Sequence, residues 1–128
     1  MNIAEYISDE MKKPFEPGKT DCANTADRWF MMRRGISAME HFGRQVHNAD
    51  DMEQWLSEPR AIIKGVKAVA VANNVPVTRD PKPGDIGIVI VDNRACIALY
   101  NGDAWWSRDE DGFIVTDDTY RFIAWSVG

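Results

Sequence analysis

The hydrophobic positions in the first half of the chain recur with the period of an α-helix. Ile3, Ile7 and Met11 follow one another at intervals of four residues. This spacing predicts an amphipathic helix over residues 3–13, with these three side chains on its buried face. Pro14 is expected to end the helix, because proline has no backbone N–H and clashes with the preceding turn.

More helical segments are expected before the middle of the chain, each marked by caps or by apolar spacing. The first runs from Asp21 to about Arg34 and is stopped by Gly35, and a helical turn over 37–42 follows it. The next is capped by Asp50 or Asp51, holds Met52, Trp55 and Leu56, and is interrupted by Pro59. The last is a well-buried helix over 61–72. On the helix that starts at Asp21, the residues Ala23, Ala26 and Phe30 share one face, which is expected to pack inward.

The pattern changes to that of β-strands after the stiff turn Pro83-Gly84-Asp85. Residues 86–91 are rich in Ile and Val, and Asp92-Asn93 predicts a hairpin turn. Further short strands are expected over 95–100, 104–107, 113–115 and 120–127. Helices over 1–72 followed by strands over 75–128 predict a single α+β domain with an antiparallel five-stranded meander. Trp105 and Trp106 are neighbours on one strand, so one is expected in the core and the other outward.

Composition narrows the classes of function. The 128 residues include 15 Lys and Arg against 20 Asp and Glu, which gives a net charge of −5 and argues against a general nucleic-acid binder. No apolar run approaches the roughly 20 residues of a membrane span, and the first residues do not resemble a secretion signal. Two cysteines and two histidines form neither a disulfide framework nor a zinc-type cluster. The sequence predicts no cofactor, no metal and synthesis in the cytoplasm.

Cys22 is the candidate for chemistry, because it lies in the expected first turn of a helix. Unpaired amides and the helix dipole at such a position stabilise a thiolate, and the same amides can hold an oxyanion beside the sulfur. A cysteine hydrolase needs this arrangement. The competing interpretation is that Cys22 is a small buried apolar residue that begins a helix.

Three segments of the chain resemble the NlpC-type family of papain-like cysteine peptidases. Gly18-Lys19-Thr20-Asp21-Cys22 is similar to the family's Gly-x-x-Asp-Cys motif, Pro83-Gly84-Asp85-Ile86 to its Pro-Gly-Asp-Leu strand entry, and the stretch from Cys96 to Gly102 to its His-Val-Gly-Ile-Tyr-x-Gly strand. The likeness covers about residues 14–127 and is closest to short phage and prophage proteins found among tail genes. It implies a papain-like fold, with Cys22 at the nucleophile position.

The chain departs from this family at the general base. In the register set by Gly102, Cys96 stands at the family's histidine position, and residues 105–107 supply no His, Asn or Gln to orient a base. A thiol does not accept and return a proton near neutral pH as imidazole does. The resemblance also implies that Cys22 and Cys96 face each other. In a reducing cytoplasm both are then expected to remain thiols, whereas outside the cell they are able to pair as a disulfide.

Three functions follow as hypotheses. The first, by resemblance, is a structural or assembly protein of a phage or prophage tail tip, with other virion proteins as partners and a peptidase-like fold without peptidase chemistry. The second is an active cysteine hydrolase that cleaves peptidoglycan stem peptides, with Cys22 as nucleophile and His47 or His41 as a relocated base. The third is a binding module that holds peptidoglycan fragments without turnover.

Overall fold

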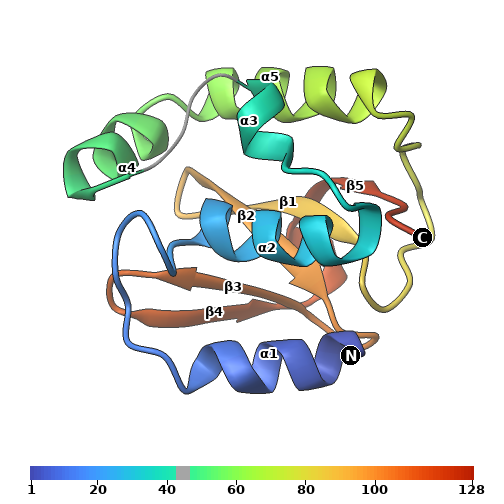
Figure 1. The fold of residues 1–128 in the computed structure, drawn as a ribbon, viewed down its shortest axis with the longest axis horizontal. Coiled ribbons are helices and arrows are strands. Elements are labelled where there is room, and N and C mark those ends of the chain that lie inside the picture. Colours follow the sequence, from blue (N-terminus) through green and yellow to red (C-terminus); the bar gives the residue numbers. More distant parts are fainter. Residues whose placement is uncertain (43–46) are drawn as a thin grey trace.

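In the computed structural model, helices precede a single sheet, as Figure 1 shows. The structure describes residues 1–42 and 47–128, without the side chains of residues 41, 42, 55 and 56. The helices are α1 (Ile3–Met11), α2 (Cys22–Arg34), α3 (Ala38–Phe42), α4 (Ala49–Leu56) and α5 (Pro59–Ala72). The strands are β1 (Ile86–Val91), β2 (Arg94–Tyr100), β3 (Trp105–Asp109), β4 (Gly112–Thr116) and β5 (Arg121–Trp125), with a 3₁₀ turn η1 (Asp118–Tyr120) before the last. The predicted α+β class is confirmed.

Local capping signals located α2 correctly but misplaced the limits of α4 and α5. Gly35 ends α2 in the left-handed conformation, with φ of 75°. The start of α4 is capped by Asn48, whose side chain accepts the Asp51 backbone N–H at 2.9 Å, and not by Asp50 or Asp51. Pro59 does not interrupt a helix but begins α5, because proline is well suited to the first helical turn.

The buried face of α1 differs from the predicted one. Met11 is 47% exposed, whereas Tyr6 and Glu10 are buried with Ile3 and Ile7. Eight residues of α-helix turn the chain about 80° past two full rotations, so the third member of an i, i+4, i+8 series leaves the apolar face. The amphipathic helix was therefore predicted correctly, but Glu10, and not Met11, lies on its buried face.

Helix α5 is less buried than its sequence suggests. Ile62 and Ala70 are its buried residues, whereas Val71 is 78% exposed. Figure 1 shows α5 lying across one side of the molecule, where it covers the sheet with one face and leaves the other to solvent. No helix in the described part of the chain is long and apolar enough to cross a membrane.

The sheet is antiparallel with the strand order β4-β3-β2-β1-β5, which corrects the predicted meander at its last step. The first four strands follow one another, and the β1–β2 turn at Asp92-Asn93 has the positive φ values of a tight hairpin. β5 does not pair with β4. It returns to the other side of β1, where Trp125 lies opposite Ile86, so the long apolar β1 is central and paired on both sides.

Both faces of the sheet are buried along β3, which corrects the expectation that Trp105 or Trp106 points outward. Trp106 lies in the large core that the helices form with the sheet. Trp105 lies on the opposite face, in a smaller core built from strand residues. Its ring crosses a row of small residues, Ala98, Gly87 and Ala124, which lie opposite one another on three strands. A Cβ at Gly87 would come within 2.8 Å of this ring, so the glycine makes room for the tryptophan.

Candidate functional site

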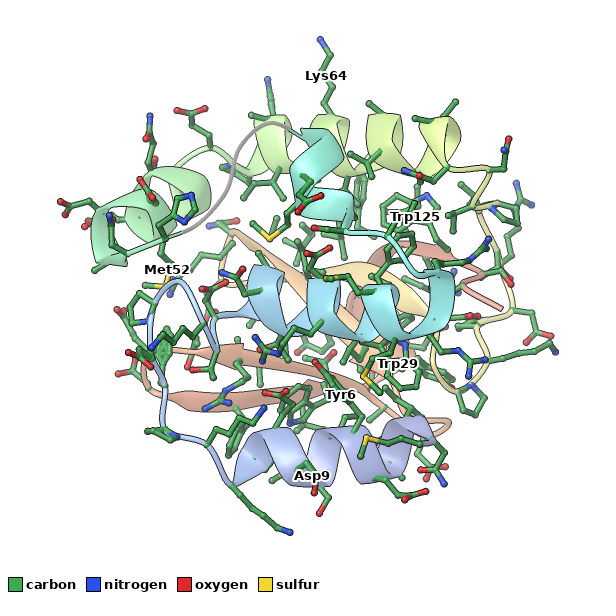
Figure 2. All side chains as sticks on the ribbon, in the orientation of Figure 1. Tyr6, Asp9, Trp29, Met52, Lys64 and Trp125 are labelled. Carbon is green, nitrogen blue, oxygen red and sulfur yellow. The ribbon has the colours of Figure 1, made fainter. Side chains whose placement is uncertain are left out.

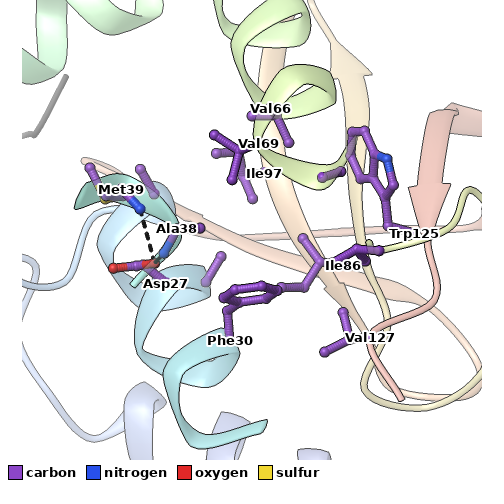
Figure 3. Close-up of a pocket in the computed structure, with 14 residues that line it drawn as sticks. Asp27, Phe30, Ala38, Met39, Val66, Val69, Ile86, Ile97, Trp125 and Val127 are labelled. Atoms are coloured by element: carbon purple, nitrogen blue, oxygen red, sulfur yellow. Dashed lines mark hydrogen bonds between the residues drawn. The ribbon is translucent and has the colours of Figure 1, made fainter. Parts of the chain in front are cut away.

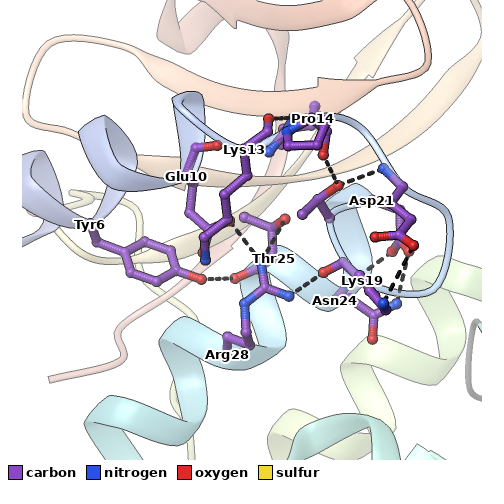
Figure 4. Close-up of polar contacts among 12 residues, drawn as sticks. Tyr6, Glu10, Lys13, Pro14, Lys19, Asp21, Asn24, Thr25 and Arg28 are labelled. Atoms are coloured by element: carbon purple, nitrogen blue, oxygen red, sulfur yellow. Dashed lines mark hydrogen bonds and ion pairs between the residues drawn. The ribbon is translucent and has the colours of Figure 1, made fainter.

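Cys22 is the first residue of α2, and the loop before it holds the helix start in place. Asp21 is the N-cap: its Oδ1 accepts the Asn24 N–H at 2.9 Å and its Oδ2 accepts the Gly18 N–H at 2.7 Å. Gly18 has φ of 89°, a conformation that glycine adopts without strain. The stretch over 18–22 is therefore a capped turn that positions the sulfur at a helix N-terminus; Figure 4 shows Asp21 and, in the first turn of α2, Asn24.

Cys22 and Cys96 line one cavity of about 200 Å³, and both are free thiols. The cavity lies where the start of α2 meets the β1–β2 and β3–β4 hairpins, and Met52 of α4, labelled in Figure 2, also borders it. Its remaining lining residues mix apolar and charged side chains: Phe15, Asp21, Ala23, Val91, Asp92, Arg94, Arg108, Asp109, Glu110 and Ile114. The two cysteines that the resemblance places face to face thus share a cavity.

The environment of Cys22 keeps its thiol protonated. The pKa of Cys22 is raised from 9.0 to about 12, chiefly by burial and further by the nearby Cys96 and Asp21, against backbone hydrogen bonds from Ile97 and Ala23 that lower it. Burial also raises the pKa of Cys96, with Asp109 acting in the same direction and Arg94 in the opposite one. Desolvation outweighs the stabilisation that a helix N-terminus gives to a thiolate.

His47 is not placed as a base for Cys22. His47 is exposed on the segment before α4, where its backbone N–H donates to Asp51 Oδ2 at 3.1 Å and its carbonyl lies against Gly18. No histidine is among the described residues that line the cavity. The side chain of His41 lies outside the described residues. The structure therefore does not bring His47 to the sulfur as the hydrolase hypothesis requires.

Polar groups on β3, where the resemblance expects a residue that orients the base, are engaged elsewhere. Ser107 Oγ donates to the Ile97 carbonyl at 2.7 Å, which joins β3 to β2 where no strand pairing connects them. The Trp105 indole N–H donates to Asp118 Oδ1 at 2.8 Å. Both contacts hold the sheet together, and neither turns a polar group toward Cys22.

The Pro-Gly-Asp stretch before β1 also has a structural task. Gly84, with φ of 97°, accepts the Trp29 indole N–H at its carbonyl at 2.8 Å, which connects α2 to the sheet. Asp85 is buried, and its carboxylate accepts backbone N–H groups from Lys82 at 2.8 Å and Val127 at 3.0 Å. The second motif of the resemblance is therefore explained by backbone hydrogen bonding.

A charged cluster that the sequence analysis missed connects α1 to α2. Glu10 is 2% exposed and its carboxylate contacts Arg28 at 2.7 Å and Lys13 at 3.0 Å (Figure 4). Burial raises the pKa of Glu10, but the hydrogen bonds from Lys13 and Arg28 outweigh burial and lower the pKa below its usual value. The Tyr6 hydroxyl donates to the Thr25 carbonyl at 2.6 Å, and burial raises the pKa of Tyr6.

Arg108 of β3 completes this cluster from the side of the sheet. Its guanidinium donates to the carbonyls of Glu10 and Lys13, both at 2.8 Å, and so satisfies the C-terminal end of α1. The signals for this cluster were a charged residue at the helical spacing of Ile3, Tyr6 and Ile7, and an arginine two positions after a core tryptophan. Such signals mark an exception to the apolar pattern, but they do not name the partner.

A second cavity, of about 80 Å³, is almost wholly apolar and separates α5 from α2 and the sheet (Figure 3). Phe30, Val66, Ile97 and Trp125 are among its lining residues. Asp27 is its one charged residue, and its carboxylate accepts N–H and O–H groups at the start of α3. The cavity reflects loose packing beneath α5 and contains no group suited to chemistry.

Comparison with known proteins identifies the family and leaves its function open. The family model described as Domain of unknown function (DUF6950) matches residues 1–127. The chain belongs to the DUF6950 family. No curated protein and no solved structure matches it. Within the described residues of this family member, no three His, Cys, Asp or Glu side chains are grouped so as to hold a metal ion.

Proposed function

We propose that this DUF6950 protein is a peptidase-like domain without peptidase chemistry, and that it serves as a structural or assembly protein of a phage or prophage tail. The motifs at 18–22, 83–86 and 96–102 support the NlpC-type ancestry, and the tail context rests on that resemblance. The scaffold would be retained because its motifs cap a helix and join α2 to the sheet, which are tasks that do not need catalysis.

One observation carries the proposal: the cavity at Cys22 contains a second thiol, Cys96, where the resemblance expects imidazole. Catalysis by a cysteine nucleophile requires a thiolate and a group that returns the proton to the leaving amine. Burial raises the pKa of Cys22 to about 12, so this thiol is protonated at pH 7. Cys96 is neutral under the same conditions and does not supply the base.

Alkylation kinetics test this proposal directly. The rate at which iodoacetamide labels Cys22 is measured from pH 6 to pH 11 in a Cys96→Ser background, with urea-unfolded protein as control. We expect labelling of the native protein to be much slower than that of the unfolded chain at every pH below 10. Rapid labelling at pH 7, with an apparent pKa below that of the unfolded chain, would contradict the proposal and support the hydrolase.

A histidine introduced at position 96 tests whether this position corresponds to the family's catalytic histidine. Cys96→His places a base beside Cys22 if the correspondence with the family is right, whereas Cys96→Gln introduces a side chain of similar size that accepts no proton at neutral pH. We expect the histidine variant to label at Cys22 at least about tenfold faster than the glutamine variant at pH 7, since an ion pair with imidazolium lowers a thiol pKa. Equal rates in the two folded variants would show that position 96 does not face the nucleophile.

Incubation with muropeptides separates the two remaining functions. The wild-type protein is expected to release no new amine from peptidoglycan stem peptides, and Cys22→Ala should behave identically. Cleavage that Cys22→Ala abolishes would establish the hydrolase. Saturable binding without cleavage would establish the binding module instead.

A further inference from the structure

The two edges of the sheet are protected very differently. Residues 76–78 run along the β5 edge, where the Thr78 N–H donates to the Ala124 carbonyl at 2.9 Å and the Ser126 N–H donates to the Pro76 carbonyl at 2.8 Å. The backbone groups of β5 that face away from β1 are thus paired in part by the chain itself. An edge covered in this way is closed to a further strand.

The other edge, β4, is open. Across the described residues, β4 has no backbone hydrogen bonds to any segment except β3. In an antiparallel ladder alternate residues direct their N–H and C=O to opposite sides, so about half of these groups in β4 face solvent. Figure 1 shows β4 as the outermost strand on this side of the sheet. The strand contains no proline and no charged residue, which are the usual protections of an edge.

Apolar side chains lie next to these free backbone groups. Phe113 is 40% exposed and Val115 is 62% exposed, and the two alternate with the half-buried Ile114. The Phe113 ring stacks on Trp106, with the ring centroids 5.7 Å apart. The Arg108 guanidinium also lies over the Phe113 ring, 5.1 Å from its centroid. Phe113 is therefore held in place without a partner and presents a preformed apolar surface along the edge.

Negative charge flanks β4 at both ends. The β3–β4 turn carries Asp109, Glu110 and Asp111, and Asp117 and Asp118 follow the strand. Arg121 pairs with Asp118 at 2.8 Å. Among the residues that the structure describes, no cation forms an ion pair with the other carboxylates. A strand added to this edge would therefore have its two ends beside a net negative charge, Asp109, Glu110 and Asp111 at one end and Asp117 at the other.

From these observations we infer that β4 is a docking site for an extended strand of a partner protein, with alternating apolar residues in its centre and Lys or Arg at both ends. Main-chain hydrogen bonds would continue the sheet, and Phe113 and Val115 would contact the partner's apolar side chains. A second copy of this chain does not fit. In an antiparallel β4–β4 pair the acidic turn at 109–111 would lie beside Asp117 and Asp118 of the other copy, and like charges in such positions repel.

This docking site requires only the edge strand, so it stands or falls independently of the chemistry at Cys22. A Cys22→Ala variant is expected to bind partner strands as the wild type does. If the protein proves to be a hydrolase, the edge remains available; if the edge binds nothing, the thiol measurements keep their meaning.

Fluorescence anisotropy with defined peptides tests the inference on the full chain. The probe is labelled Lys-Lys-Val-Thr-Val-Thr-Val-Lys-Lys, and its charge control replaces every Lys by Glu. A third peptide keeps the sequence of the probe but carries N-methyl groups on alternate residues. We expect the probe to bind at least about tenfold more tightly than either control, because one control repels the acidic ends and the other lacks main-chain donors.

Variants of the protein locate the binding. Val115→Lys places a charge on the exposed edge and should reduce affinity for the probe at least about tenfold, whereas Val71→Lys, on an exposed position of α5, should not change it. Glu110→Lys combined with Asp111→Lys should reduce the preference for the basic probe over the Glu-flanked peptide. Equal binding of the probe and the N-methylated peptide, no binding of the probe, or a concentration-dependent dimer that Val115→Lys abolishes would each overturn the inference.

Discussion

The cavity at Cys22 lies at the start of α2, and the cluster around Glu10 lies between α1 and α2. Both sites bury titratable groups, but the pKa is raised at the first and lowered at the second. Cys22 and Cys96 are buried at one cavity, and burial raises the pKa of each thiol. Glu10 is at least as buried, yet its pKa is lowered by the hydrogen bonds from Lys13 and Arg28. A buried group keeps its charge where partners replace water, and it becomes neutral where they do not.

This difference separates a structural site from a catalytic site that lacks its base. Nucleophilic chemistry at a buried cysteine needs a proton acceptor such as imidazole, and no histidine is among the described residues that line the cavity at Cys22. The charged partners in this part of the molecule serve Glu10 and the C-terminal end of α1 instead. The comparison predicts that the Glu10 cluster dominates stability at neutral pH, whereas the buried cysteines lower stability once the pH rises above about 9.

Removal of Glu10 should give the largest effect. Glu10→Ala leaves the half-buried Arg28 without its carboxylate, and losing hydrogen bonds to a charged group costs about 2 kcal/mol of unfolding free energy. Urea denaturation at pH 7 measures this change, with Glu5→Ala, at an exposed position of the same helix, as the matched control expected to lose less than about 0.5 kcal/mol. A similar small loss in both variants would remove the distinction between the two regions.

High pH should reveal Cys22. Its folded pKa is raised from 9.0 to about 12, so its contribution to stability is complete below pH 9 and is lost as the pH rises toward 12. In that interval the unfolded chain releases a proton that the folded chain retains, and the unfolding free energy falls by up to about 1.4 kcal/mol per pH unit from this group.

The measurement compares wild type with Cys22→Ala by urea denaturation from pH 7 to pH 11. The two stabilities should run parallel up to about pH 8, converge above pH 9 and cross before pH 11, while Tyr6 and Cys96 contribute to both proteins. Parallel curves over the whole range would indicate that Cys22 titrates as an ordinary solvent-exposed thiol.

At neutral pH the loss of the thiol should have the smallest effect. Cys22→Ala removes one heavy atom that borders an existing cavity, so the cost is about 1 kcal/mol or less. Thermal unfolding at pH 7 tests this value against Ala26→Gly on the same buried face of α2, which should lose more because glycine also weakens the helix. A larger loss for Cys22→Ala would mean that the sulfur holds the helix start in place.

Much of the candidate site could be predicted because its signals are local. Asp21 caps α2 and Gly35 ends it through contacts within a few residues, so the helix start at Cys22 was placed correctly. The resemblance implied that Cys96 lies near Cys22, and both residues line the same cavity. The partners of Glu10 were not predictable in this way, because Arg28 and Arg108 come from segments far along the chain, and a charged residue on an apolar face does not name its partner.

The sequence by itself determined the elements whose causes are local: a capped helix at Cys22, tight turns such as Asp92-Asn93, and the change from helical to strand periodicity near residue 86. Tertiary structure decided which surfaces those elements bury. Trp105 and Trp106 both became core residues because side chains cover both faces of the sheet along β3, and the pKa of the Cys22 thiol is raised because burial outweighs the backbone hydrogen bonds that favour the thiolate. Burial and its electrostatic consequences depend on groups that meet only after the chain has folded.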